Sequence, residues 1–408
     1  MPIDIKKTLL QIKNLESTDN INALIQRLNA TFQNFTAASL NLKNLEEKIA
    51  EAWDTGKAKF TFAKTDGNET IGDLISADED DQAPHITIGT DGSQVFSSAH
   101  EFSSASLINI GSVVIPYFNQ SVPVHLASEP TVYNSSDDIT TIDTEDKISD
   151  EDLISYERTL KEIEEVTRLC RNYKKHGLPI VAMLDGTLIH WHLKTFNNIY
   201  VEHFIQRFSK AILELKEHKI PLISYISSSR SNDIINMLRI YKCPYEKVDC
   251  RKNCHGIPST SLPCNPSQNY KPILDRKLIE KYLVEKQASN GTRTAIFKSN
   301  NSILELYPSD IKVCFFYFHT GYEVARVEIP AYVANDNKLL HLAHNALKLQ
   351  CKVGFGYPVV LSEAHNQAVV SKKDRQIFYD LLKEHYLKQS GAKVNLSTKE
   401  LRKRISFV

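Results

Sequence analysis

In Ile180–Val181–Ala182–Met183–Leu184–Asp185–Gly186–Thr187–Leu188, an apolar run leads directly into an acid and a glycine. A short apolar run bounded by turn residues is typical of a buried β-strand. In an α/β sheet, the groups that follow the carboxyl end of a strand line the ligand crevice. We therefore predict an α/β fold in which Asp185 lies at the edge of a crevice.

A second Asp-Gly pair lies upstream, in His85–Ile86–Thr87–Ile88–Gly89–Thr90–Asp91–Gly92–Ser93, where we expect a strand to end at Asp91. Two carboxylates at the ends of separate strands are a common way to hold a hard divalent cation. Asp-Gly is also ordinary turn chemistry, so the spacing by itself leaves both interpretations open.

The composition narrows the class of protein. The 408 residues can form one large domain or two ordinary ones. Because 49 basic residues balance 49 acidic ones, any nucleic-acid surface has to be local. No apolar stretch is long enough for a membrane span and the first residues lack the apolar core of a signal peptide, so we expect a cytoplasmic protein with no membrane contact. Seven cysteines, an odd number, argue against a complete disulfide framework in that setting.

The chain divides into an N-terminal helical arm, residues 1–80, and a main domain, residues 81–408. Apolar residues recur at helical spacing through residues 4–60, and this arm either covers the sheet or pairs subunits. Within the main domain, residues 118–150 are rich in Ser, Asp and Thr and have no periodicity. We expect them to form a long insertion.

Residues 150–175 have a strong helical pattern that carries several acids. At about 100° per residue, Glu162 falls on one edge of the apolar stripe, Glu164 lies on its other flank and Glu165 faces away. An acid flanked by apolar neighbours is unfavourable unless it has a partner such as a metal. Glu162 is therefore the candidate third metal ligand, and a solvated helix acid is the alternative.

Two further stretches carry groups that could bind ligands. Residues 221–241 read as a strand, a serine-rich turn containing Arg230 and a helix, which predicts a phosphate clamp or simply a capped helix. The loop at residues 243–270 is poor in apolar residues and contains four cysteines: Cys243, Cys250, Cys254 and Cys264. Their irregular spacing is compatible with a structural zinc site or with four free thiols.

Several short motifs stand in a fixed order from about residue 85 to the C-terminus. They are Thr90–Asp91–Gly92–Ser93, Met183–Leu184–Asp185–Gly186–Thr187–Leu188, Tyr225–Ile226–Ser227–Ser228–Ser229–Arg230–Ser231, Phe315–Phe316–Tyr317, Ala325–Arg326–Val327–Glu328–Ile329–Pro330, Gly356–Tyr357–Pro358 and Glu363–Ala364–His365. Each motif is weak alone, but the ordered set resembles the NurA family of nucleases. One departure is Thr187, where the family usually has serine.

This resemblance implies an RNase H-like core, a mixed sheet flanked by helices, to which the N-terminal helical arm and the cysteine-containing insertion are added. It implies a nuclease that depends on Mn²⁺, or on Mg²⁺, and that acts on DNA ends in end resection during DNA repair. It further implies a homodimer that works with a HerA-type hexameric ATPase translocase.

The matched motifs also imply roles for particular residues of this sequence. The resemblance implies metal-binding acids at Asp91, Asp185 and Glu162, with Glu165 as the alternative helix acid. It implies a C-terminal active-site pair, Tyr357 and His365, while Ser93 and Arg230 are candidate substrate-binding residues.

Two other functions stay open at this point. An ATPase or kinase of the sugar-kinase type shares the RNase H-like core and the strand-end Asp-Gly pair, although no Gly-rich phosphate loop is visible. A non-catalytic adaptor of a DNA motor is the second alternative.

Overall fold

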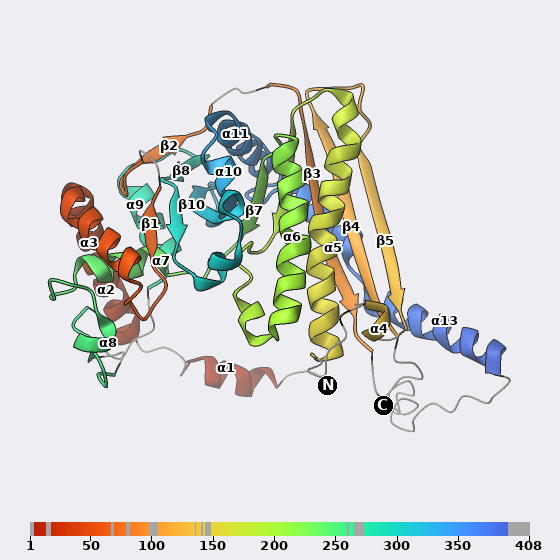
Figure 1. Cartoon of the computed structure of the whole chain (residues 1–408), viewed down its shortest axis with the longest axis horizontal. Coiled ribbons are helices and arrows are strands. Elements are labelled where there is room, and N and C mark those ends of the chain that lie inside the picture. The colour runs from red at the N-terminus through yellow and green to blue at the C-terminus, as the bar shows by residue number, and fades with distance from the viewer. Residues whose placement is uncertain are drawn as a thin grey trace. The chain divides into compact units, whose positions relative to one another are not determined.

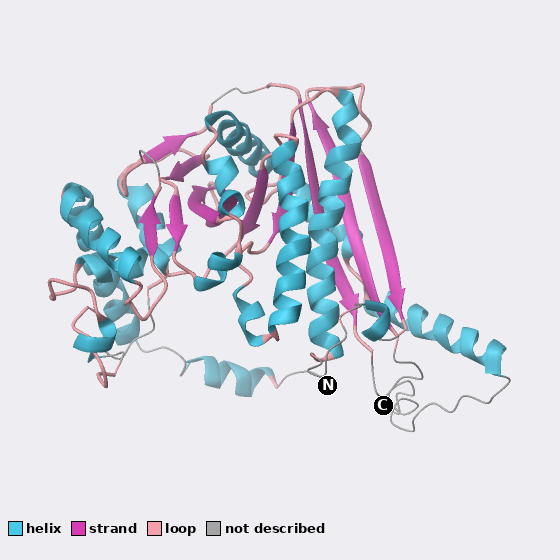
Figure 2. Ribbon diagram, viewed as in Figure 1, coloured by secondary structure: helices cyan, strands magenta, loops and turns pink. Residues whose placement is uncertain are grey.

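A computed structural model describes most of the chain (Figure 1; Figure 2). The described residues are 4–13, 18–66, 69–78, 82–97, 105–134, 136–139, 142, 148–258, 261–264 and 273–390. They fall into two compact units, each assembled from segments that are distant in the sequence. The first unit comprises Met1–Ser76, Ser227–Asn301 and Cys314–Val327, and the second comprises Ala77–Ile226, Ser302–Val313 and Glu328–Val408.

A mixed sheet forms the centre of the second unit, with strand order β7-β6-β3-β4-β5. Its strands are β3 (His85–Val95), β4 (Ser106–Tyr117), β5 (His125–Tyr133), β6 (Ile180–Asp185) and β7 (Leu222–Ile226). The neighbours β3, β4 and β5 are antiparallel, whereas β6 is parallel to both β3 and β7. The carboxyl end of β6 therefore lies beside β3 at the middle of the sheet.

Helices flank both faces of this sheet. The contacts of two glycines in β3 identify the two faces, because alternate residues of a strand point to opposite sides. Gly92 faces α5 (Asp150–Tyr173), which packs beside α6 (Asn198–Glu217). Gly89 faces α12 (Val359–Ala368), which follows α11 (Asn337–Val353). In Figure 1, α5 and α6 lie in front of the strands.

The remaining elements of the second unit are short or peripheral. They are α4 (Ser136–Ile139), α10 (Ala331–Ala334), α13 (Lys372–Ser390) and the 3-10 turns η1 (Lys174–His176), η2 (Trp191–Thr195), η4 (Ser302–Leu306) and η5 (Ser309–Ile311). Helix α5 begins as its sequence predicts, since the Ser149 hydroxyl accepts a hydrogen bond from the Asp152 N–H and three acids occupy the first turn.

The first unit packs helices against short strands. Its helices are α1 (Ile5–Lys13), α2 (Thr18–Leu40), α3 (Leu42–Thr55), α7 (Asp233–Tyr241), α8 (Cys250–Asn253) and α9 (Asp275–Glu285). Its strands are β1 (Ala63–Thr65), β2 (Leu74–Ser76), β8 (Thr292–Thr294) and β9 (Phe297–Ser299), together with most of β10 (Val313–His319) and the first four residues of β11 (Val324–Pro330). Residues of α2, α3, α7 and α9 share one apolar core, for which Phe35, Leu45, Ile234 and Leu278 are examples.

The structure differs from the sequence prediction in three places. Strand β3 does not end at Asp91 but continues to Val95. The expected insertion at residues 118–150 contains β5 and α4, because β5 is an edge strand whose mainly exposed residues give no apolar signal. The N-terminal helices group with residues 227–301 and 314–327 instead of forming a separate arm over residues 1–80.

Among the described helices, none combines the length and the apolar character that a bilayer crossing requires.

Candidate active site

Asp91 and Asp185 lie on neighbouring strands of the second unit. The parallel register of β3 and β6 pairs Thr90 with Leu184, so the two aspartates occupy the next position along each strand. Desolvation raises the pKa of Asp185, and the nearby charge of Asp91 raises it further. The two carboxylates that sequence motifs singled out are therefore close enough to repel one another.

Glu162 approaches these aspartates from α5. Gly92 leaves the space for its carboxylate, since a Cβ atom there would lie 2.5 Å from Glu162 Oε1. The Thr90 hydroxyl donates to the Glu162 carbonyl at 2.8 Å and fixes the helix against the strand. Gly92 therefore allows α5 to approach β3 closely. It has this role within the strand and does not form a turn after Asp91.

The environment of Glu162 disfavours its charge. Its side chain is only 13% exposed. Burial raises the pKa of Glu162 from 4.5 to about 8, with a partly compensating effect of Arg158 and further increases from Asp91 and Asp185. Arg158 Nε lies 3.2 Å from Glu162 Oε1, so one cation already faces this group of three carboxylates.

The neighbouring acids of α5 are engaged elsewhere. Arg168 donates two hydrogen bonds to Glu165, at 2.6 and 2.7 Å. Arg207 donates to Glu164, with both bonds at 2.8 Å. Of the three acids weighed from the sequence, Glu162 is the one whose pKa is raised by the charges of Asp91 and Asp185.

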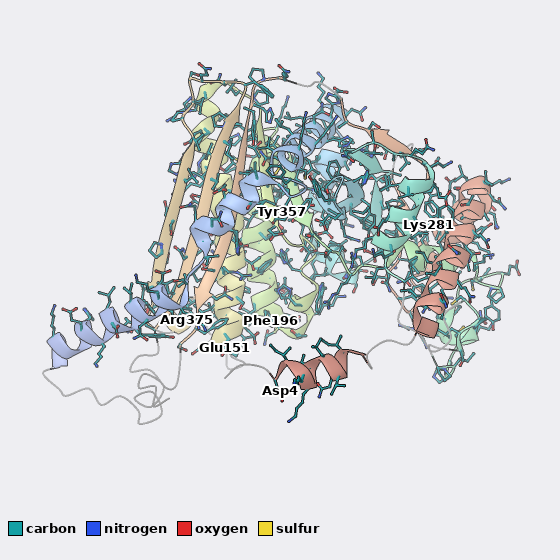
Figure 3. All side chains as sticks on the ribbon, turned by 180° about the vertical axis from the view of Figure 1, so that it is seen from behind. Asp4, Glu151, Phe196, Lys281, Tyr357 and Arg375 are labelled. Carbon is teal, nitrogen blue, oxygen red and sulfur yellow. The ribbon has the colours of Figure 1, made fainter. Side chains whose placement is uncertain are left out.

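Tyr357 and His365 enter the site from α12 and the turn that precedes it. Nδ1 of His365 lies 2.7 Å from Oδ2 of Asp91. Tyr357 hydrogen-bonds the Asp185 carboxylate, which lowers the pKa of that acid. The Tyr357 ring packs edge-on against Tyr225, with centroids 5.2 Å apart. Figure 3, which views the molecule from behind, shows Tyr357 in front of the strands, on the side opposite α5 and α6.

A buried glutamate that sequence reasoning missed supports the loop after Asp185. Glu328 is 1% exposed, and its Oε2 accepts hydrogen bonds from the Leu188 N–H and from the Thr187 hydroxyl, both at 2.8 Å. Gly186 adopts a φ of +95°, which suits the turn between these contacts and the strand. The available signal was a lone acid within the apolar strand that ends at Pro330.

The position of α12 depends on close packing against β4. A Cβ atom at Gly111 would lie 2.2 Å from the Ala364 carbonyl oxygen, so the helix rests directly on the strand backbone. Ser93 and Asn109 both donate to the Ala368 carbonyl, at 2.5 and 2.8 Å. The Ser93 hydroxyl thus anchors the end of α12, and its expected contact with substrate stays a prediction.

The remaining candidates lie in the first unit. Arg230 is exposed in the segment between β7 and α7, and its role as a phosphate clamp stays a prediction. The cysteines of the loop converge, because a single cavity is lined by all four: Cys243, Cys250, Cys254 and Cys264.

The side chains of the second unit suit a hard cation by their chemistry. Carboxylate oxygens are the donors that Mn²⁺ and Mg²⁺ prefer, and a cation would offset the mutual repulsion among Asp91, Asp185 and Glu162. In the part of the chain that the structure describes, no three His, Cys, Asp or Glu side chains are already arranged to hold a metal ion. The arginine beside Glu162 and the histidine beside Asp91 occupy the carboxylates instead.

Comparison with known families gives one match. The NurA domain matches residues 85–370, well over half of the chain, from the first residue of β3 to just beyond α12. This segment contains every candidate site residue. None of the curated proteins compared with the chain matches it.

Proposed function

Because the chain belongs to the NurA family, which is associated with nucleases, we propose that it is a metal-dependent deoxyribonuclease that hydrolyses phosphodiester bonds at DNA ends. The observation that carries this proposal is the approach of Asp91, Asp185 and Glu162 from three separate elements. Three acids held together against their mutual repulsion are typical of a site built for positive charge.

The architecture of the second unit supports an RNase H-like core. Three antiparallel strands are followed by two parallel ones, and β6 lies next to β3, the first strand of the meander. The candidate acids lie on β3 and β6 at the centre of the sheet, and Glu162 lies on the connecting helix α5. This arrangement places them at the carboxyl end of β6, where α/β proteins bind their ligands.

Mn²⁺ or Mg²⁺ is the expected cofactor, and Asp91, Asp185 and Glu162 would hold it. When bound, such an ion supplies charge that activates water for attack and offsets the negative charge of the scissile phosphate. Glu162 would have to be ionised to hold a cation, and its raised pKa opposes that, so metal binding should strengthen as pH rises. Arg158, 3.2 Å from Glu162, would supply a further positive charge beside the phosphate.

Tyr357 and His365 position the two aspartates. The hydrogen bond from Tyr357 orients the carboxylate of Asp185, and His365 does the same for Asp91. His365 is also exposed, with 64% of its side chain accessible, so solvent reaches the imidazole. These two residues thus connect the acids to the surface from which DNA would enter.

A partner is expected to bring DNA to this site. The formal net charge is zero, and phosphate neutralisation supplies most non-specific affinity for DNA. The NurA domain is generally associated with DNA and with HerA proteins. We therefore expect a HerA-type hexameric translocase to feed DNA to a homodimer of this chain.

The decisive experiment uses end-labelled linear DNA with Mn²⁺, Mg²⁺ or chelator, each with and without the translocase. Wild-type protein should cleave with Mn²⁺ or Mg²⁺ and not with chelator. Asp91→Asn and Asp185→Asn should lose at least about 100-fold in rate while keeping the thermal melting of the metal-free protein. Glu165→Gln is the matched control, because that acid pairs with Arg168, and it should keep its activity.

The same experiment tests the adaptor. If both aspartate variants match wild type with the translocase present, the chain acts as a non-catalytic adaptor and the nuclease proposal is wrong. Hydrolysis of ATP by the isolated chain, lost in the same variants, would favour the ATPase alternative.

A further inference from the structure

Four cysteines of the first unit surround one small cavity. Cys243 follows α7, Cys250 begins α8, Cys254 directly follows α8, and Cys264 lies ten residues further on. All four line the same cavity, and all are free thiols. The cavity walls are otherwise largely apolar and include Phe60, Ile240, Val248 and Pro263.

This segment has little else to hold it. Between α7 and α9 the described residues contain one four-residue α-helix, α8, and few apolar side chains. Its backbone is tied to the rest of the unit by isolated bonds, such as Cys250 N–H to the Lys57 carbonyl at 3.2 Å and Val248 N–H to Glu51 at 3.0 Å. Cys254 and Cys264 are nevertheless each only 7% exposed. Irregular backbone folded around buried thiols is typical of a metal-linked loop.

Cations surround the cysteines. Arg239 Nη2 lies 3.9 Å from Cys264 Sγ, and its guanidinium stacks on the Phe60 ring. Lys48 favours the charged form of Cys243, and Lys59 does so for Cys254. Burial and the mutual influence of the cysteines act in the opposite direction and raise the pKa of both thiols. A bound dication would remove this conflict, because it stabilises all four thiolates together.

We propose that Cys243, Cys250, Cys254 and Cys264 form a tetrathiolate site for a structural zinc ion that fixes this loop to α7. Four protein ligands leave no open coordination position, which is the pattern of structural zinc and not of catalytic zinc. The four thiols line one cavity, but no three of them lie at ligand spacing in the part of the chain that the structure describes, so an ion would have to bring them closer together. This site is independent of the carboxylates in the second unit.

The test measures metal in the full-length protein purified under reducing conditions without chelator. Elemental analysis should give roughly one zinc per chain, and a thiol-blocking mercurial should release it to a colorimetric chelator. After removal of zinc, Co²⁺ should give the intense thiolate-to-cobalt charge-transfer absorption of a four-sulfur site. The double variant C254S/C264S should lose the zinc, whereas the matched control Cys351→Ser, a buried cysteine of α11, should retain it.

Three outcomes would overturn this proposal. One is wild-type protein without zinc that also fails to take up Co²⁺. A second is zinc that survives in C254S/C264S. The third is iron with acid-labile sulfide and a brown colour, which would assign the same thiolates to an iron–sulfur cluster. Because the first and third readouts use wild-type protein, misfolding of a variant does not affect them.

A separate observation concerns the turn that precedes α12. Phe355 is 82% exposed and has a φ of +52°, a left-handed conformation that a bulky residue rarely adopts. Phe355 lies between two glycines whose backbone shapes this turn. A Cβ atom at Gly354 would lie 1.9 Å from the Tyr357 carbonyl oxygen, and Gly356 has a φ of +100°. The turn is tied down by the Tyr225 hydroxyl, which donates to the Gly356 carbonyl at 3.3 Å.

A rigid turn that exposes an aromatic ring two residues from Tyr357 has a functional explanation. Left-handed backbone at a non-glycine residue is more frequent near functional sites, and Phe355 lies two residues from Tyr357 while its exposed ring gains no stability from burial. From this placement we infer that Phe355 is a stacking platform for an unpaired base of the DNA end, a positioning residue that rests on the proposed nuclease function. Bases of any sequence can stack on such a ring.

The test compares Phe355→Ala and Phe355→Tyr in the full-length protein on single-stranded and blunt double-stranded DNA. Phe355→Ala should weaken binding of single strands roughly tenfold and raise KM more than it lowers kcat, and Phe355→Tyr should restore both. A 2-aminopurine at the terminal position should lose fluorescence quenching in Phe355→Ala. The control is Phe118→Ala. Phe118 is also exposed and has a φ of +53°, but it follows the last residue of β4, which pairs with the first residue of β3 and not with Asp91.

The outcomes separate this inference from the nuclease proposal. Unchanged affinity and quenching in an active Phe355→Ala enzyme would refute stacking and leave the nuclease intact. A change of oligomeric state without a change in DNA affinity would assign the ring to a protein interface and also refute it. Absence of both cleavage and DNA binding in wild-type protein would refute the two ideas together.

Discussion

Glu162→Gln should stabilise the metal-free protein at alkaline pH while it abolishes cleavage. Burial and the two neighbouring aspartates raise the pKa of Glu162 from 4.5 to about 8. Below about pH 4.5 the acid is neutral in both the folded and the unfolded chain, so it has no effect. As pH rises, the unfolded chain loses its proton first, and the folded state loses stability until the pH passes about 8. At about 1.4 kcal/mol per pH unit, the whole effect is on the order of 5 kcal/mol as an upper bound.

The assay is urea unfolding in chelator from pH 5 to pH 9. Glutamine has the shape of glutamate but does not titrate, so the stability of Glu162→Gln relative to wild type should grow by up to about 3.5 kcal/mol between pH 5 and pH 8. The Arg158 ion pair requires an ionised Glu162, so its effect is already contained in the pKa of that acid and adds nothing further to the slope. Added Mn²⁺ should stabilise wild type and hardly affect the variant, because binding to the native state adds stability.

The reasoning fails if the two pH profiles run parallel within about 0.5 kcal/mol, an ordinary surface effect. Glu165→Gln serves as the control on the same helix, since Glu165 pairs with Arg168. It should keep the pH profile and the Mn²⁺ response of wild type. If Glu165→Gln and Glu162→Gln exchange these behaviours, the helix acid of the site has been assigned to the wrong residue.

Three further substitutions test how the site is supported. Gly111→Ala should destabilise the protein by roughly 3 kcal/mol or more, seen as a large fall in melting temperature, because its Cβ would lie 2.2 Å from a backbone carbonyl of α12. Gly92→Ala should leave stability within about 1–2 kcal/mol but lower kcat at least about tenfold, because the added atom meets the flexible side chain of Glu162 and pushes it from the aspartates. Glu328→Ala should cost about 1–3 kcal/mol in urea unfolding, since it leaves the Leu188 N–H buried without its acceptor, and it should also slow cleavage.

The sequence was most informative where the residue pattern had a local cause. The apolar run of β6 predicted both the strand and the placement of Asp185 at its end. Helical periodicity in α5 favoured Glu162 over Glu164 and Glu165 as the acid at the edge of the apolar stripe, because direction around a helix depends only on position in the chain. The same spacing also predicts the pair of Glu165 with Arg168, three residues later on the helix, but it does not reveal Arg207 of α6 as the partner of Glu164.

The errors arose where one residue type serves two physical purposes. Gly92 was interpreted as a turn residue, yet it lies within a strand and gives space to a side chain from another element. Glycine meets both requirements, so the sequence alone does not distinguish them. Strand β5 was missed for a related reason. It is an edge strand with Pro130 in its middle and mostly exposed side chains, a composition that a loop shares.

Gly92 and Gly111 also explain how acids from opposite faces of a sheet can act together. Asp91 points toward α12, where His365 holds it, whereas Glu162 belongs to α5 on the other face. A sheet normally separates side chains on its two faces, and Gly92 removes the one side chain that would separate these two. Gly111 lets α12 approach the sheet closely from the opposite side. The carboxylate cluster therefore depends as much on the packing of α5 and α12 as on the acids themselves, and a change in either helix should alter metal binding without touching a ligand.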